Sequence, residues 1–250
     1  MKVVVNPKYA HLCSWIESIP LSFEAEGSVI YKGRNVIKVM SSDGIEFNIK
    51  KYKKPHIVNR FVYTFFRKSK PFRAYHNGLR IQEKGFDTAE SVAYMEINRG
   101  GLFSDSYYVS LQCLGTREIR EYYSGPLSGN EALIDEFARY SAKLHDAGIY
   151  HLDYSPGNIL IREDGTFILV DVNRMKFIRV SPDKGCRNFA RLFEHDDMYE
   201  RIGMVYSQSR KEPFSPEKAV ELILKYRKAF LHKKACTRKI KTSFKSLAPR

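Results

Sequence analysis

The sequence predicts an α+β fold with two lobes, a small lobe built on an antiparallel sheet and a larger, mainly helical lobe. Short β-rich runs alternate with turn residues from Ser28 to Gln112, and helical patterns dominate after Ser128. The chain has 250 residues, of which 43% are hydrophobic and 13% aromatic, enough to bury a core that divides into lobes. The parts that we expect are a helix and lead-in at 1–27, a small lobe at 28–114, a helical lobe at 115–235 and a basic tail at 236–250.

The chain is strongly basic, with a formal net charge of +14 at pH 7. Such a charge predicts a negatively charged partner: nucleic acid, anionic lipid or a polyphosphorylated substrate. The four cysteines show no C-x-x-C and no metal-ligand spacing, which predicts reduced thiols. No apolar run approaches the ~18 residues of a membrane-spanning helix, and the N-terminus lacks the features of a signal peptide. We therefore expect a cytoplasmic protein.

The small lobe begins with a short helix, at about Lys8 to Ser18 and ended by Pro20, and a lead-in strand. Three β-rich runs follow, SVIYK, VIKVMS and IEFNIKKY, with tight turns at Gly33-Arg34-Asn35 and Asp43-Gly44 between them. This pattern predicts an antiparallel meander. The remaining elements of the lobe are a helix and two strands, at Ser69–Glu83, Ala93–Ile97 and Ser106–Gln112.

The stretch from Tyr150 to Asn173 carries the chemistry. It contains Asp153 in an H-x-D motif, Asn158 after four intervening residues, and Asp171 after two apolar runs that flank an Asp-Gly turn. The turn predicts a hairpin that brings Asn158 and Asp171 to the same edge. Phosphoryl transfer needs one carboxylate at the acceptor hydroxyl, and an Asn and a second carboxylate that hold Mg²⁺ against the ATP phosphates. The motif resembles the catalytic loop and D-F-G region of protein-kinase-like proteins, with Asp153 as catalytic residue and Asn158 and Asp171 as metal ligands.

Two further segments resemble the nucleotide-binding parts of such proteins. The run from Phe47 to Lys50 matches the V-A-I-K arrangement, and alternation places Phe47 and Ile49 on one face and Lys50 on the other, beside the nucleotide. Lys50 would hold the α and β phosphates. Lys51 is the register-slip alternative, and a solvated cluster of lysines is another. The turn at Gly33 would cover the phosphates, although it has a single glycine and no G-x-G-x-x-G.

One feature departs from ordinary kinases, which pair this lysine with a Glu on the following helix. From Phe47 to Gln82 there are ten Lys or Arg and no Asp or Glu. Tyr75 and His76 stand where the acid would fall, and Glu83 comes about two turns too late. Three explanations stay open: an unusual helix placement that brings Glu83 near, another carboxylate, or a lysine held by the nucleotide alone.

The segment HIVNRFVYTFFRKSKPFR, residues 56–73, alternates basic and aromatic residues at helical spacing. Val58, Phe61 and Phe65 can share one face, with basic residues on another. This pattern is typical of an amphipathic helix at a membrane interface. The alternative is a helix whose aromatic side packs onto the small lobe while its basic side is solvated, because amphipathicity does not distinguish a core face from a membrane face.

The chain after Asp171 differs from that of protein kinases. Asn173 replaces the Gly of D-F-G, and no A-P-E and no long phosphorylation loop follow. Such a lobe offers little platform for a peptide, which favours a small or lipid-linked acceptor. Pro216 begins a helix that we expect to end at about His232, and the chain from Leu222 onward has ten Lys or Arg and no acid. The basic regions 50–80 and 222–250 together would concentrate the protein at an anionic surface.

Residues 28–200 as a whole resemble the lipopolysaccharide core kinase family (Kdo/WaaP type). The segments that carry the resemblance are IEFNIKKYKKP, RKSKPFRAYHNGLRIQEKGFDTAESVAYME, LHDAGIYHLDYSPGNILI and ILVDVNRMKF. The resemblance implies phosphorylation of a Kdo or heptose hydroxyl of the lipid A–inner core, with ATP and Mg²⁺, at the cytoplasmic face of the inner membrane of a Gram-negative bacterium. The residues implicated are Asp153 and Lys50 in catalysis, Gly33, Lys50, Asn158 and Asp171 in nucleotide binding, and Asn158 and Asp171 in metal binding.

Other functions remain possible interpretations of the same residues. A catalytically silent kinase fold that acts as a scaffold is favoured by the missing helix Glu and opposed by the intact Asp153, Asn158 and Asp171. A small atypical protein kinase acting on serine, threonine or tyrosine is a third interpretation. Nucleic-acid binding is suggested only by the charge.

Overall fold

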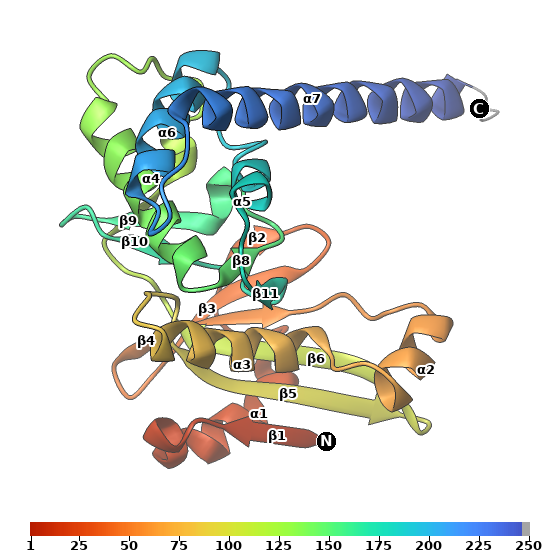
Figure 1. The fold of residues 1–250 in the computed structure, drawn as a ribbon. Helices are drawn as coiled ribbons and strands as arrows, with labels where there is room; N and C mark the ends of the chain where they lie inside the picture. The colour runs from red at the N-terminus through yellow and green to blue at the C-terminus, as the bar shows by residue number, and fades with distance from the viewer. Residues whose placement is uncertain (247–250) are drawn as a thin grey trace. The chain divides into compact units, whose positions relative to one another are not determined.

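The computed structural model describes residues 1–246, which form two compact units (Figure 1). Unit 1 comprises Met1–Thr116 and Ile168–Arg174, and unit 2 comprises Arg117–Phe167 and the chain from Met175 onward. The chain passes between the units three times: within the strand β7 (Thr116–Glu118), within the strand β10 (Phe167–Leu169) and between Arg174 and Met175. The mixed composition of strands and helices is the predicted α+β class.

Unit 1 is built on a six-stranded antiparallel sheet with the order β1-β5-β6-β4-β3-β2. Its strands are β1 (Lys2–Val5), β2 (Ser28–Lys32), β3 (Val36–Ser42), β4 (Ile45–Lys51), β5 (Ser91–Arg99) and β6 (Leu102–Leu111). Its helices are η1 (Pro7–Leu12), α1 (Cys13–Ser22), α2 (Ile57–Phe65) and α3 (Lys70–Glu83). The predicted meander is confirmed as β2-β3-β4, and β5 and β6 pair around the turn at Gly100 and Gly101.

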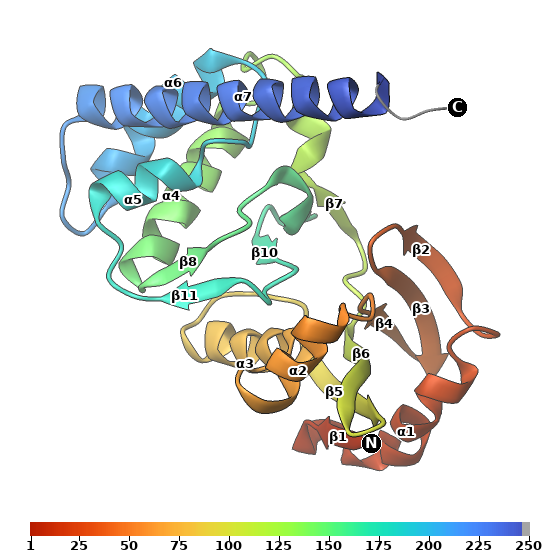
Figure 2. The same cartoon turned by 90° about the vertical axis from the view of Figure 1, so that its right-hand side faces the viewer.

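The two faces of this sheet pack against different helices (Figures 1 and 2). On one face Phe47 and Ile49 are fully buried with the apolar residues of η1 and α1. On the other face Tyr94 and Tyr108 pack against α3 through Tyr75. Because side chains alternate along β4, Lys50 lies on the α3 face, as predicted.

The N-terminal segment differs from the expectation of one short helix ended by Pro20. Residues 7–12 form the 3₁₀ helix η1, and α1 then continues through Pro20 to Ser22. The last turn persists because the N–H of Phe23 donates to the carbonyl of Ile19, and both side chains are buried. β1 pairs with β5, so residues 1–27 belong to unit 1 rather than forming a separate lead-in.

Unit 2 is mainly helical around an aromatic core that includes Phe137, Tyr154, Phe189 and Phe193. Its helices are η2 (Ile119–Tyr122), α4 (Glu131–Asp146), η3 (Pro156–Asn158), α5 (Pro182–Asn188), α6 (Asp196–Ser209) and α7 (Pro216–Ser246). Its strands are β8 (Ile149–His151), β9 (Ile159–Arg162) and β11 (Met175–Phe177). β8 pairs with β11, and β9 lies between β7 and β10, so the predicted hairpin is present.

The helix that begins at Pro216 is longer than predicted. It starts as expected, since Ser215 Oγ accepts a hydrogen bond from the N–H of Lys218, but it continues to Ser246 rather than ending near His232. No Gly or Pro interrupts residues 229–246, and lysine and alanine favour helix. The expected tail at 236–250 is therefore helical as far as Ser246, and the rest of it lies outside the described residues.

Candidate active site

The lysine predicted to bind phosphate forms an ion pair in unit 1. Lys50 Nζ lies 2.6 Å from Asp171 Oδ1, and only 11% of the Lys50 side chain is exposed. Of the three explanations left open for the missing helix Glu, the structure therefore shows another carboxylate, that of Asp171. Lys51 lies on the opposite face and pairs with Glu24 at 2.6 Å, which separates it from Asp171.

The loop that carries Asp171 is held by two amide side chains. Asp171 has a φ of +54°, a left-handed conformation that Asp tolerates better than most residues. The Nδ2 of Asn173 donates to the Asp171 carboxylate, and the Nδ2 of Asn77 on α3 donates to the carbonyl of Val172 at 2.7 Å. Asn173, which replaces the Gly of D-F-G, thus contacts the carboxylate that pairs with Lys50.

Positive charge accumulates at the start of α3. Burial lowers the pKa of Lys70, and the neighbouring charges of Arg34, Arg174, Arg73 and Lys50 lower it further. Burial also lowers the pKa of Arg73, and Arg67 adds to that effect. Cations that depress one another in this way favour the binding of an anion with several charges.

Tyr52 lies among these groups. The Nζ atoms of Lys50 and Lys70 lie 5.5 and 5.7 Å from the centre of its ring. Its hydroxyl is buried and has no hydrogen-bond partner within the described part of the chain. Burial, and then the Asp171 carboxylate, raise the pKa of Tyr52 well above its ordinary value. The phenol therefore stays neutral beside the two lysines.

Gly33 lies in the turn between β2 and β3, where its N–H donates to the carbonyl of Asn35 at 3.0 Å. A Cβ atom at Gly33 would lie 2.5 Å from the Tyr31 hydroxyl. Any side chain at this position would displace Tyr31.

In unit 2, the carboxylate of Asp153 is fixed by an arginine that the sequence analysis did not identify. Arg191 Nη2 lies 2.5 Å from Asp153 Oδ1, and its guanidinium also reaches the carbonyls of Leu152 and Tyr154 at 3.4 Å. Arg191 follows the motif by 38 residues, outside any local pattern that could have indicated it. It belongs to the turn that follows α5.

His151 and Asn158 organise the same loop. His151 is fully buried, and its Nδ1 accepts a hydrogen bond from the N–H of Asp153 at 3.0 Å. The Nδ2 of Asn158 donates to the carbonyl of Asp153 at 2.8 Å, which leaves its amide oxygen as the group that can bind a cation. Asn158 and Asp171 offer oxygen atoms, the ligands that Mg²⁺ prefers. Among residues 1–246 no cluster of three or more His, Cys, Asp or Glu could hold a metal.

A buried hydrogen-bond network contacts the backbone of the segment that carries Asp153. Asn188 Nδ2 donates to the carbonyl of His151 at 2.9 Å, and Asn188 Oδ1 lies 3.0 Å from His145 Nε2. His145 Nδ1 lies 2.9 Å from the hydroxyl of Tyr206, which in turn accepts from Arg210 Nη1 at 2.6 Å. The network connects α4, α5 and α6 to β8.

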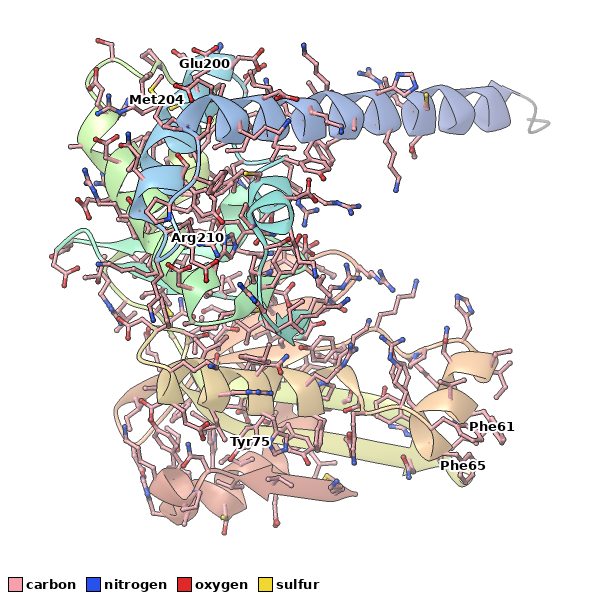
Figure 3. The ribbon with its side chains drawn as sticks, in the orientation of Figure 1. Phe61, Phe65, Tyr75, Glu200, Met204 and Arg210 are labelled. Carbon is pink, nitrogen blue, oxygen red and sulfur yellow. The ribbon has the colours of Figure 1, made fainter. Side chains whose placement is uncertain are left out.

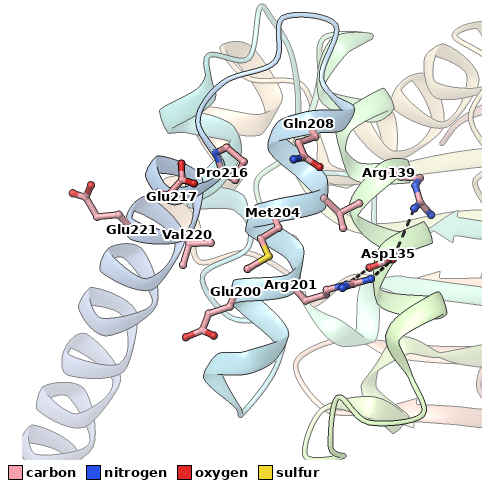
Figure 4. A pocket seen from close by; sticks show the side chains of 11 residues that line it. Asp135, Arg139, Glu200, Arg201, Met204, Gln208, Pro216, Glu217, Val220 and Glu221 are labelled. Atoms are coloured by element: carbon pink, nitrogen blue, oxygen red, sulfur yellow. Dashed lines mark hydrogen bonds and ion pairs between the residues drawn. The ribbon is translucent and has the colours of Figure 1, made fainter.

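A groove of about 840 Å³ lies elsewhere in unit 2, between α4, α6 and α7 (Figure 4). Its apolar part is formed by Met204, Val205, Pro216 and Val220, and its charged part includes Asp135, which pairs with Arg201 at 2.6 Å. None of the residues predicted for catalysis or nucleotide binding lines it.

Comparisons with known proteins identify a family and a similar fold. Residues 33–218 match the model of the lipopolysaccharide kinase (Kdo/WaaP) family. A solved structure described as WaaP in complex with acyl carrier protein has a similar fold, with a TM-score of 0.62 and 16% sequence identity. That alignment covers 93% of this chain and 99% of the other. No curated protein matches the sequence. Since the family match spans most of its length, the chain belongs to the lipopolysaccharide kinase (Kdo/WaaP) family and is an ATP-dependent phosphotransferase with an alcohol group as acceptor.

Proposed function

We propose that this chain phosphorylates a sugar hydroxyl, on Kdo or heptose, of the lipopolysaccharide inner core at the surface of the inner membrane. The observation that carries the proposal is the pair of local arrangements that kinase chemistry requires. Unit 1 holds Lys50 against Asp171, and unit 2 holds Asp153 and Asn158 on one ordered loop. The family match supports the acceptor class.

In the proposed mechanism these groups act on one bound nucleotide. Lys50 neutralises the α and β phosphates of ATP, and the turn at Gly33 covers them. Asn158 and Asp171 would hold Mg²⁺, which neutralises phosphate charge and fixes the phosphates for in-line transfer. Asp153 orients the acceptor hydroxyl and takes its proton late in the transfer.

Two side chains orient the Asp153 and Asp171 carboxylates before substrate binds. Arg191 keeps the Asp153 carboxylate oriented, because its guanidinium donates a charge-assisted hydrogen bond to that carboxylate. Asn173 donates from its Nδ2 to the Asp171 carboxylate. Because the Asp153 and Asp171 carboxylates are already fixed, the binding of ATP and the sugar costs less side-chain entropy.

The distribution of charge supports an acidic, lipid-linked acceptor. The cations around Lys70 and Arg73 favour an anion, and a lipid A–core acceptor carries phosphate and carboxylate groups. None of the helices within residues 1–246 combines the length and apolarity needed to cross a membrane. The basic regions 50–80 and 222–250 instead support attachment at an anionic membrane surface.

The test is ATP turnover with a core oligosaccharide or a lipid A–core acceptor, comparing the wild type with Asp153→Ala. We expect the variant to lose at least ~100-fold in kcat, since removal of a general acid–base group typically costs 10²–10⁴-fold. Glu163→Gln, an exposed acid on the hairpin after the loop, is the matched control and should retain activity. Full activity of Asp153→Ala would remove Asp153 from the mechanism.

Mass spectrometry of lipid A–core from cells with and without the protein tests the substrate. Loss of one phosphate unit in the deletion supports the proposal. If labelled ATP instead marks protein in a lysate and leaves the lipid fraction unlabelled, the chain is a protein kinase. If the wild type neither turns over ATP nor gains thermal stability from Mg-ATP, it is a silent scaffold.

A further inference from the structure

The helix α2 exposes its apolar side. No residue of α2 is buried, and five large apolar side chains of this region are at least half exposed: Ile57 60%, Val58 71%, Phe61 50%, Phe65 61% and the following Phe66 77%. Figure 3 shows Phe61 and Phe65 next to each other on α2. These five residues are called the α2 aromatic surface below.

The opposite, more polar side of α2 is the side that packs. Arg60 Nε donates to the carbonyl of Phe103 at 2.7 Å, and its Nη2 donates to that of Arg99 at 3.1 Å. Thr64 Oγ1 accepts from the N–H of Phe103 at 2.9 Å, and the Tyr63 ring lies 5.5 Å from the Phe103 ring. A helix of a globular protein normally turns its apolar side to the core. Here the polar side of α2 forms the hydrogen bonds to β6. These hydrogen bonds fix the orientation of α2 with its aromatic side exposed to solvent.

The three phenylalanines form one cluster. The ring centres of Phe61 and Phe65 are 4.8 Å apart, those of Phe61 and Phe66 are 5.9 Å apart, and those of Phe65 and Phe66 are 6.4 Å apart. Contiguous exposed apolar groups of this kind mark interaction sites. Scattered surface phenylalanines would not be in ring contact.

The charge around the cluster identifies the partner. Lys53, Lys54, Arg67 and Lys68 flank α2 and are exposed, and the chain from Phe47 to Gln82 contains no acid. Asp105 on the neighbouring β6 is paired with Arg99 at 3.2 Å. An apolar cluster surrounded by unmixed positive charge is complementary to anionic headgroups above acyl chains. The exposure of Phe61 and Phe65 contradicts the alternative in which the aromatic side of residues 56–73 packs onto the small lobe.

We propose that the α2 aromatic surface inserts into the interface of an anionic lipid bilayer and holds unit 1 there. The role of this insertion rests on the proposed function: lipid binding by α2 would bring the enzyme to a lipid-linked acceptor. The lipid-binding step itself depends only on α2 and its basic neighbours.

The test is sedimentation of the full chain with vesicles of phosphatidylcholine containing phosphatidylglycerol, and with phosphatidylcholine vesicles alone. We expect the triple variant Phe61→Ser, Phe65→Ser and Phe66→Ser to bind the anionic vesicles at least ~100-fold more weakly, because three large apolar side chains lose their burial in lipid. The side chains are exposed, so folding should be unaffected. Leu21→Ser, which changes an 89% exposed leucine on α1, is the matched control and should bind like the wild type.

Two further measurements distinguish insertion from electrostatic attraction alone. The variant Arg67→Gln and Lys68→Gln should weaken binding to anionic vesicles and lower its salt dependence, while binding to pure phosphatidylcholine changes little. A Phe65→Trp variant should gain fluorescence that brominated acyl chains quench, beyond the signal of Trp15 in the wild type. Unchanged vesicle binding by the triple serine variant, or no quenching of Trp at position 65, overturns the proposal.

The same variants separate this inference from the proposed function. With a deacylated, water-soluble core acceptor the triple variant should keep the wild-type kcat, and with the acceptor in anionic vesicles it should lose activity in parallel with binding. If the wild type phosphorylates neither acceptor, the proposed function fails while the vesicle measurements still test α2. If the triple variant loses activity equally on both acceptors, α2 acts on catalysis and the lipid-binding role is wrong.

Discussion

Arg191 donates a charge-assisted hydrogen bond to Asp153, with Nη2 2.5 Å from Oδ1. The same guanidinium reaches the carbonyls on either side of Asp153, so it fixes the backbone of the loop as well as the carboxylate. An arginine can do this because its planar group presents several donors in a fixed geometry. Arg191 is therefore a positioning residue for the proposed catalytic carboxylate.

Replacement of Arg191 by alanine should reduce kcat by about 10–100-fold, because misplacement of a catalytic group by about 1 Å can cost ~100-fold. The apparent affinity for ATP should change little, since Lys50 and Asp171 are untouched. Arg191→Lys should restore only part of the loss because an ammonium cannot reproduce the forked contacts. Arg179→Ala, at an exposed arginine that pairs with Glu212, is the control. A fall in ATP affinity without a fall in kcat would contradict the positioning role.

Lys50 and Lys51 offer a direct comparison of adjacent lysines. Lys50 pairs with Asp171 and Lys51 with Glu24, so Lys50→Ala should abolish most ATP turnover while Lys51→Ala should leave it near the wild-type level. The exposed Lys51–Glu24 pair contributes at most about 1 kcal/mol to stability. Steady-state kinetics of both variants at saturating ATP make the comparison. Equal losses would mean that the register of β4 does not determine the phosphate-binding lysine.

Local sequence patterns predicted the parts of the fold that depend on alternation and turns. The predicted alternation along β4 is confirmed, with Phe47 and Ile49 on one face of the sheet and Lys50 on the other. It holds because β4 is a regular strand paired with β3 and β6. The contacts that the sequence could not predict are those between distant segments. Arg191 meets Asp153 across 38 residues and Asn77 meets Val172 across 95, and no spacing rule connects such pairs.

Helix ends were also poorly predicted, for identifiable reasons. Pro20 was expected to end a helix, but burial of Ile19 and Phe23 stabilised the turn that contains it. The last turns of α7 continue beyond the expected end near His232, because lysine does not disfavour helix. The orientation of α2 could not be derived from periodicity, because the same pattern fits a helix with its aromatic side toward the core or away from it.

The ion pair between Asp146 and Arg210 should be important for stability. Both side chains are only 8% exposed, and Arg210 Nε lies 2.6 Å from Asp146 Oδ1. Asp146 also accepts from the N–H of Lys211, and Arg210 donates to the carbonyl of Val180. Asp146→Ala should lower the free energy of unfolding by about 3–5 kcal/mol, since it leaves a buried guanidinium without its partner.

Chemical denaturation of Asp146→Ala beside Glu136→Ala measures this effect. Glu136 forms an exposed pair with Arg139 on the same helix, and its removal should cost less than about 1 kcal/mol. A loss below that level for Asp146→Ala would show that the buried pair is not a stabilising contact. A double variant with Arg210→Met should recover part of the loss, because an apolar side chain carries no charge to leave unpaired.

His145 should make the folded state sensitive to pH. Burial lowers the pKa of His145 from 6.5 to about 4, although the hydrogen bond to Asn188 opposes the shift. Asn188 Nδ2 is used by the carbonyl of His151, so Asn188 Oδ1 accepts from His145 Nε2–H, and Nδ1 accepts from Tyr206. The neutral ring is the form that this arrangement holds.

The direction in which stability changes with pH follows from the protons that His145 binds in the folded and unfolded states. Between pH 4 and 6.5 the unfolded chain binds a proton at His145 and the folded chain does not, so folding is favoured less as the pH falls. The contribution is fully present above pH 6.5 and decreases by on the order of 3 kcal/mol toward pH 4. Thermal unfolding at intervals from pH 7.5 to 4 should show this decline. In His145→Gln the slope between pH 6.5 and 4 should be shallower, although the variant is less stable at pH 7, and an unchanged slope would assign the effect to another group. The effect of Asp135 falls in a different pH range from that of His145. The hydrogen bond from Arg201 lowers the pKa of Asp135 below 3.8, so the contribution of this ion pair to stability is lost only at lower pH.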